Sequence, residues 1–358
     1  QWNKSMQAAQ RHNQPGVFTT LVGWEWSQSA SGVNLHRVVV SDMEPSVAQG
    51  IDPVGSDEAP YPEQLWDSLE KLSSSTGADF ISIPHNANLS KGYMFAKQQL
   101  NGETMTPTYA NKRAKWERLV EVTQIKGDSE THPDLAPDDE FADFEQFNFY
   151  IQRFPQGLGY KVQRGDTIRT ALQDGMALEQ ELGVNPFQFG LIGSTDAHSG
   201  MASAEEPNFW GKGALDSTPE TKKRSNDPEG FGDGMQSWNG WNMAAAGLAA
   251  VWSDNNDRQS IIAAMKRRET YATTGPRIGL RAFAGWDFVE EDLLRADLVQ
   301  QGYARGVPMG GELEGAPYGA APRFMIMASK GANDHNLDRV QVVKSWLDGD
   351  GNNQEKIF

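Results

Sequence analysis

Residues 62–85 read PEQLWDSLEKLSSSTGADFISIPH, and this stretch predicts a helix followed by a buried strand. Three leucines recur at helical spacing over residues 62–75, with a proline in the first turn and Gly77 just past the end. Residues 80–83 (FISI) form a short apolar run that is typical of a buried strand. A helix that leads into such a strand is the repeating unit of an α/β domain.

The same alternation extends along most of the chain. Apolar runs typical of strands occur at residues 18–24 (FTTLVGW), 35–40 (LHRVVV), 119–125 (LVEVTQI), 189–193 (FGLIG) and, more weakly, 247–252 (GLAAVW). A helix is expected after Asp166, which suits its N-cap, up to Gly183, and another over residues 258–269. The pattern therefore predicts an α/β domain with a mostly parallel sheet.

The sequence pattern changes from alternating strands and helices to β-like segments after residue 276. Residues 277–283, 323–328 and 339–346 are β-like and separated by Gly, Pro, Asn and Asp. We expect a catalytic domain over residues 1–276 and a small β-rich, sandwich-like domain over residues 277–358. The last residues, GNNQEKIF, resemble the start of another strand, which predicts that this second domain is truncated.

Composition excludes several classes of function. Lys plus Arg is 32 and Asp plus Glu is 48, a net charge of −16 that disfavours nucleic acid as a partner. The absence of cysteine removes disulfides, thiolate metal sites and cysteine nucleophiles, and no apolar run is long enough to span a membrane. A small anionic substrate remains possible, because a bound divalent cation reverses the local field.

Two long irregular segments, residues 126–161 and 202–242, interrupt the pattern. Loops of this length in α/β enzymes often build or cover the active site. For the second loop, a role at the active site and a plain surface insertion are equally supported.

Acidic and imidazole residues stand at or near the ends of four separate apolar runs. Glu25 follows the first run, His85 follows FISIP, Glu121 lies in LVEVTQI, and Asp196 and His198 follow FGLIGST. In a parallel α/β barrel these strand ends converge on one face, where active sites are built. Imidazoles and carboxylates without sulfur suit Zn, Mn or Fe.

Each residue also has a structural interpretation. His85 could cap a turn, and Asp196 could form an Asx-turn. Glu25 and Glu121 lie among apolar residues, where a buried carboxylate needs a cation or hydrogen-bond donors. Taken together, the four positions favour a metal site.

Several motifs carry a family resemblance. GSTDAHSG resembles the last metal-binding motif of the PHP (polymerase and histidinol phosphatase) superfamily, GWEW with LHRVVV resembles its Gly-x-Glu segment with a downstream His, and IPHN resembles its Pro-His motif. RRETYATTGP resembles the segment that closes the catalytic domain in one branch. With EVTQIKGDSETHP and VPMGGEL, nearly the whole chain resembles the DUF3604 family.

The resemblance implies a distorted (β/α)7 barrel that holds two or three divalent metal ions (Zn, Mn or Fe). Glu25 would bridge two metals, His85 and Glu121 would ligate one of them, and Asp196 the other. His198 would complete a further site or contact substrate, and His36 is an additional candidate ligand. The family often has His at the position of Glu121, which leaves metal identity and number open.

One departure from the family concerns its first strands. PHP proteins open with His-x-His and then an Asp-His pair, but none of the six histidines here stands two residues from another. We therefore expect a barrel that is incomplete at its N-terminus, either as a fragment or completed by a separate upstream segment. An incomplete barrel exposes sheet edges and is expected to be unstable alone.

The sequence thus predicts a metal-dependent, phosphoesterase-like hydrolase. Metal-activated water would attack a phosphate ester, or a related ester or carbamate, with Asp196 accepting the water proton and His198 acting as general acid. Asn86 and Asn88 are candidates for orienting ligands or binding substrate. Lys126 and Lys91 are candidates for binding an anionic group, although ordinary solvated lysines are the simpler interpretation.

The alternative is a protein without catalytic activity. Eleven tryptophans and the β-rich tail would suit a carbohydrate- or partner-binding protein, or a degenerate PHP scaffold that binds a ligand without turnover. The compartment is not determined, although a periplasmic location would suit an acidic two-domain hydrolase.

Overall fold

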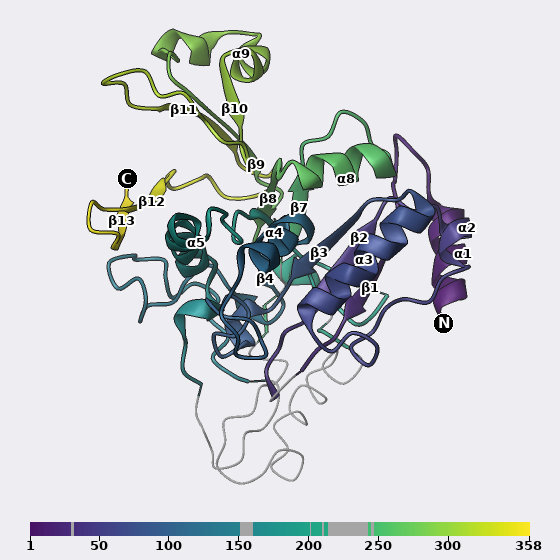
Figure 1. The fold of residues 1–358 in the computed structure, drawn as a ribbon. Coiled ribbons are helices and arrows are strands. Elements are labelled where there is room, and N and C mark those ends of the chain that lie inside the picture. The colour runs from purple at the N-terminus through teal and green to yellow at the C-terminus, as the bar shows by residue number, and fades with distance from the viewer. Residues whose placement is uncertain (30–31, 151–159, 201, 210, 214–242, 245–246) are drawn as a thin grey trace.

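The computed structural model describes residues 1–29, 32–150, 160–200, 202–209, 211–213, 243–244 and 247–358 (Figure 1). Most of the long segment at residues 202–242, whose role as a site cover was one of two interpretations, lies outside the described residues. Among those described, no helix has the length and hydrophobicity needed to cross a bilayer.

The first sheet contains β1 (Val22–Trp26), β2 (Arg37–Ser41) and β3 (Phe80–Pro84) in that order. β2 runs antiparallel to both neighbours, so the expected parallel arrangement is wrong for these three strands. Only ten residues, 27–36, separate β1 from β2, and a parallel pair needs a crossover of a dozen residues or more. The chain therefore turns back on itself, and β1 and β3 point the same way.

Parallel pairing occurs between β4 (Leu119–Gln124) and β6 (Gly190–Gly193), and β5 (Gly127–Asp128) pairs antiparallel with β4. β7 (Leu248–Val251) and β8 (Thr270–Thr273) form a further antiparallel pair. β3 contacts β4 and β6 contacts β8, so the three sheets follow one another in space (Figure 1). A closed barrel stays a prediction.

Helices cover these strands. α3 (Pro62–Thr76) contacts β3 and α4 (Pro107–Trp116), while α8 (Arg258–Lys266) contacts β3 and β7. At the N-terminus, α1 (Trp2–His12) packs against the short α2 (Pro45–Ala48). The remaining helical turns of the described residues are η2 (Ala87–Leu89), η3 (Arg164–Asp166), η4 (Glu206–Asn208) and η7 (Glu290–Leu294).

The predicted helix of residues 62–75 is confirmed, and Gly77 ends it in the left-handed conformation at φ 73°. The second predicted helix is present as α5 (Ile168–Leu182), but Thr167 rather than Asp166 is its N-cap. The Asp166 carboxylate instead accepts hydrogen bonds from Ser90 Oγ at 2.8 Å and from the amides of Gly92 and Gln163 at 2.6 and 2.7 Å. Asp166 therefore ties two loops together instead of capping the helix.

The residues after 276 form two sheets that do not pair with each other in the described chain. β9 (Gly279–Gly285) lies between β10 (Gly306–Pro308) and β11 (Arg323–Ser329), with α9 (Leu298–Arg305) against β9 and β10. β12 (Val343–Leu347) and β13 (Asn353–Ile357) form a hairpin, which confirms the strand expected at the end of the sequence. The division of the chain at residue 276 remains a prediction.

The hairpin packs on α5. Glu355 accepts hydrogen bonds from Arg169 Nε at 3.2 Å and Gln173 Nε2 at 3.1 Å, and Asn353 donates to Asp174 at 3.2 Å. Part of the expected C-terminal domain is thus held by polar contacts to a helix of the first part of the chain.

Asp128, at the end of β5, gives the protein a pH-dependent stability. Burial and the nearby charge of Glu130 raise the pKa of Asp128 from 3.8 to about 8. The folded chain then binds a proton that the unfolded chain has lost, so the free energy of unfolding falls as pH rises between 3.8 and about 8. We expect Asp128→Asn to flatten this dependence in urea unfolding followed at several pH values, whereas the exposed Asp57→Asn leaves it unchanged. Equal slopes for the wild type and Asp128→Asn would contradict this assignment.

Candidate metal centre

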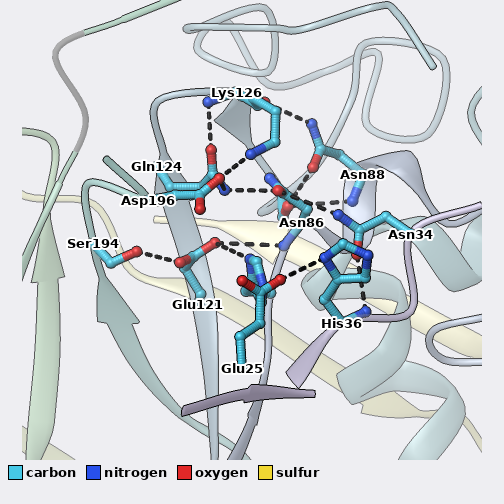
Figure 2. Close-up of polar contacts among 12 residues, drawn as sticks. Glu25, Asn34, His36, Asn86, Asn88, Glu121, Gln124, Lys126, Ser194 and Asp196 are labelled. Carbon is cyan, nitrogen blue, oxygen red and sulfur yellow. Dashed lines mark hydrogen bonds and ion pairs between the residues drawn. The ribbon is translucent and has the colours of Figure 1, made fainter. Parts of the chain in front are cut away.

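Glu25, His36 and His85 form the compact centre of the site, and Figure 2 shows Glu25 and His36 pointing toward each other there. Glu25 lies near the end of β1, His85 follows β3, and His36 immediately precedes β2. Because β2 is antiparallel to its neighbours, its beginning lies at the same edge of the sheet as the ends of β1 and β3. His36 Nδ1 is 2.6 Å and His85 Nε2 3.3 Å from Glu25 Oε1, so the three side chains meet at one oxygen.

Glu25 and His36 differ in ionisation. Burial alone would raise the pKa of Glu25, but hydrogen bonds from His36 and His85 outweigh it and hold that pKa well below its usual range. Burial lowers the pKa of His36. A carboxylate that stays ionised beside a neutral imidazole is the protonation state in which both side chains bind a divalent cation.

His85 also faces Glu121, which lies in the middle of β4. Glu121 is 3% exposed, and burial raises the pKa of its carboxyl group. Its Oε1 accepts from the amide of Asn86 at 3.4 Å, and its Oε2 accepts from Ser194 Oγ. Glu121 is therefore held at the site from two sides.

The distance between His85 Nδ1 and Glu121 Oε1 indicates whether a metal ion would fit between these two side chains. His85 Nδ1 is buried without a hydrogen-bond partner among the described residues, and it lies 3.8 Å from Glu121 Oε1. That separation is too long for a hydrogen bond. Two ligands that are each about 2 Å from a shared zinc ion lie up to about 4 Å apart. The orphaned nitrogen and the buried carboxylate thus fit a cation between them.

Asp196 lies beside this centre but pairs with ammonium groups. Lys126 Nζ and Lys212 Nζ both donate to its Oδ2, the second at 2.7 Å. Burial alone would raise the pKa of Asp196, but the charges of the two lysines lower it far below its usual range. Its φ of 48° is left-handed, a strained conformation that clusters at functional sites.

His198 is the least enclosed of the predicted residues. Its side chain is 56% exposed, and its Nδ1 lies 2.9 Å from Lys212 Nζ and 2.9 Å from the carbonyl oxygen of Asp196. The structure therefore places it at the rim, next to Asp196 and away from the group of Glu25, His36 and His85.

The predicted substrate-binding residues connect these parts. Asn86 Oδ1 accepts from Gln124 Nε2 at 2.7 Å, and the same amide donates to Asp196 Oδ2 at 2.8 Å. Asn88 Nδ2 donates to the carbonyl oxygen of Lys126 at 3.0 Å and so supports the turn that carries this lysine. The interpretation of Lys126 as an ordinary solvated lysine is wrong, because it is only 4% exposed. Its Nζ forms an ion pair with the carboxylate of Asp196, which is 70 residues away in the sequence.

Three further side chains complete the site without having been predicted: Gln124, Ser194 and Lys212. Gln124 lies in the predicted strand of residues 119–125 and Ser194 directly follows that of residues 189–193, so their position near the strand ends was an available signal. Lys212 comes from the loop whose role was left open, and no local pattern marks it. Lys91, the other candidate lysine, instead lies with its Nζ 5.2 Å from the centre of the Tyr150 ring.

The fold and the site together define a protein of helices and small sheets with a candidate metal centre lined by carboxylates and imidazoles. Protein-family comparison matches residues 1–358 to the family described as "Protein of unknown function (DUF3604)". The chain belongs to the DUF3604 family. Comparisons with curated proteins and with solved structures find no match.

Proposed function

We propose that this protein is a metal-dependent hydrolase of small anionic phosphate esters or related esters or carbamates, built on a PHP-type barrel. The observation that carries the proposal is the meeting of His36 and His85 at Glu25, with the second nitrogen of His85 directed at the buried Glu121. Carboxylates and imidazoles held this closely, and partly without other partners, are the ligand set of Zn, Mn or Fe.

The residues of the site would have separate roles in binding metal and transferring protons. Glu25 and His36 would hold one divalent cation, and Glu121 with Nδ1 of His85 would hold a second, while Nε2 of His85 would donate its proton to Glu25. When bound, such cations supply a nucleophilic water at neutral pH and polarise the bond to be cleaved. Asp196 lies beside both groups and is ionised, so it can join a cation or accept a proton. His198, exposed at the rim, can donate a proton to a leaving group.

Ligand binding without turnover is the second candidate. Most tryptophans of the described chain are packed against other parts of the protein; Trp26 and Trp66, for example, are fully buried. This burial removes the main support for sugar stacking on exposed rings. The buried His85 Nδ1, which has no hydrogen-bond partner among the described residues, supports the hydrolase, in which it would serve as a metal ligand.

Metal analysis of the intact protein separates the two candidates. We expect the protein purified with Mn or Zn to retain about two equivalents of metal after desalting, and to hydrolyse p-nitrophenyl phosphate or an activated ester in a chelator-sensitive manner. Metal-free protein of unchanged fold, with no turnover after metal is added back, would instead support the binding protein.

A further inference from the structure

Two ammonium groups converge on one carboxylate oxygen beside the candidate metal centre. Lys126 reaches Asp196 Oδ2 from the end of β4, and Lys212 reaches the same oxygen from a loop far along the chain. Lys212 Nζ also donates to the carbonyl oxygen of Asp196 at 3.0 Å, so it contacts this residue at both its side chain and its backbone. The ends of two long, flexible side chains are thus held at one point.

This arrangement is costly for a structural role. Lysine is almost never buried unless it is paired, and taking an ammonium out of water costs several kcal/mol before compensation. The side chain of Lys126 is 5% exposed and that of Lys212 20% exposed, although the protein as a whole carries a charge of −16. The two ammonium groups share the single carboxylate of Asp196, so one positive charge is left unbalanced between them, and a bound anion would balance it.

Asn86 contributes a third donor. It is fully buried, its φ of 53° is left-handed, and its side-chain oxygen is occupied by Gln124 at 2.7 Å. Its Nδ2 is buried without an acceptor among the described residues. An unsatisfied buried donor destabilises the folded protein, and an acceptor oxygen from a ligand would remove this cost.

The three donors lie next to the candidate ligands. The backbone amide of Asn86 donates to Glu121, and Gln124 links the Asn86 side chain to Asp196. Figure 2 shows Lys126, Asn86, Gln124 and Asp196 grouped on the side of the centre opposite to Glu25. A group bound to these donors would therefore present its reacting atom to the metal centre.

We propose that Lys126, Lys212 and Asn86 form a subsite for the phosphoryl group of a phosphate monoester. The inference rests on the proposed hydrolase function and selects its substrate. A dianionic phosphoryl group has three terminal oxygens, enough for two ammonium groups, one amide and a cation, and lysine is a common point-charge binder of phosphate. Neutral esters and carbamates offer a single carbonyl oxygen and no charge, so they leave the ammonium groups unused.

The subsite is tested with inorganic phosphate as the probe. The full chain is loaded with Mn, excess metal is removed, and phosphate is titrated by calorimetry into the wild type, Lys212→Met, Lys212→Arg and Lys91→Met. We expect Lys212→Met to weaken phosphate binding at least about tenfold, because a hydrogen bond between charged groups is lost. Lys212→Arg retains most of the affinity, and Lys91→Met, which alters a lysine outside the subsite, leaves it unchanged.

Turnover gives a second readout. In Lys212→Met, kcat/KM for p-nitrophenyl phosphate falls by at least about ten times the factor seen for neutral p-nitrophenyl acetate, and the metal content stays the same. Equal phosphate affinity in the wild type and Lys212→Met, or an equal loss for both substrates, would overturn the subsite.

Failure of the hydrolase proposal would give a different result, because the protein would then bind no metal. Lys212-dependent phosphate binding in that same preparation would still uphold the subsite.

Discussion

Replacing His85 with alanine is expected to remove most of the bound metal and to lower hydrolytic kcat/KM by more than about a hundredfold. Loss of an outer-shell partner alone typically costs 10–100-fold in metal affinity or activity. His85 offers one nitrogen to each half of the centre, at 3.3 Å from Glu25 and 3.8 Å from Glu121. Its removal therefore affects both groups of ligands at once.

The measurement is metal content by mass spectrometry together with steady-state turnover of p-nitrophenyl phosphate. His12, which is exposed in the last turn of α1, provides the matched control, and His12→Ala leaves both quantities unchanged. Asp196→Ala is expected to abolish turnover as well. Unaltered metal content in both His85→Ala and Asp196→Ala would refute the metal centre as drawn.

Glu117→Ala is expected to lower the free energy of unfolding by about 3–5 kcal/mol. Glu117 follows α4 and is 1% exposed, and it forms ion pairs with Arg37 and Arg113, each at 2.9 Å. Both guanidinium groups are also buried, and that of Arg113 lies 4.7 Å from the centre of the Phe187 ring. Without the carboxylate, two positive charges stay in the core unpaired.

Urea unfolding followed by tryptophan fluorescence measures this loss. The neighbouring pair of Lys115 and Glu70 is more than half exposed on both sides, so Glu70→Ala changes the stability by no more than about 1 kcal/mol. A change within 1 kcal/mol for Glu117→Ala as well would show that the buried triad contributes nothing beyond a surface pair.

The buried triad also bears on the site. Arg37 begins β2 and directly follows His36, so its pairing with Glu117 fixes the start of the strand that carries this histidine. The stability of the core and the position of a candidate ligand are thus coupled through one residue.

Much of the architecture was readable from local pattern. The helix of α3, the strands β3, β4 and β6 and the final strand β13 lie within a few residues of their predicted positions. Glu25, His85 and Glu121 were singled out for standing at or within such strands, and the structure brings them together. Apolar periodicity, prolines and glycines act over a few residues, which is why one sequence suffices to locate these elements.

What the sequence determined by itself is the place of each element and the kind of side chain at its end. Only the tertiary structure decided that β2 runs antiparallel, which brings His36 to Glu25, and that Lys126 is buried against Asp196. It alone also revealed that Lys212 joins that pair. The physical reason is distance along the chain: strand direction and the pairing of charges depend on contacts between residues 11 to 70 positions apart. Local propensity carries no information about such contacts.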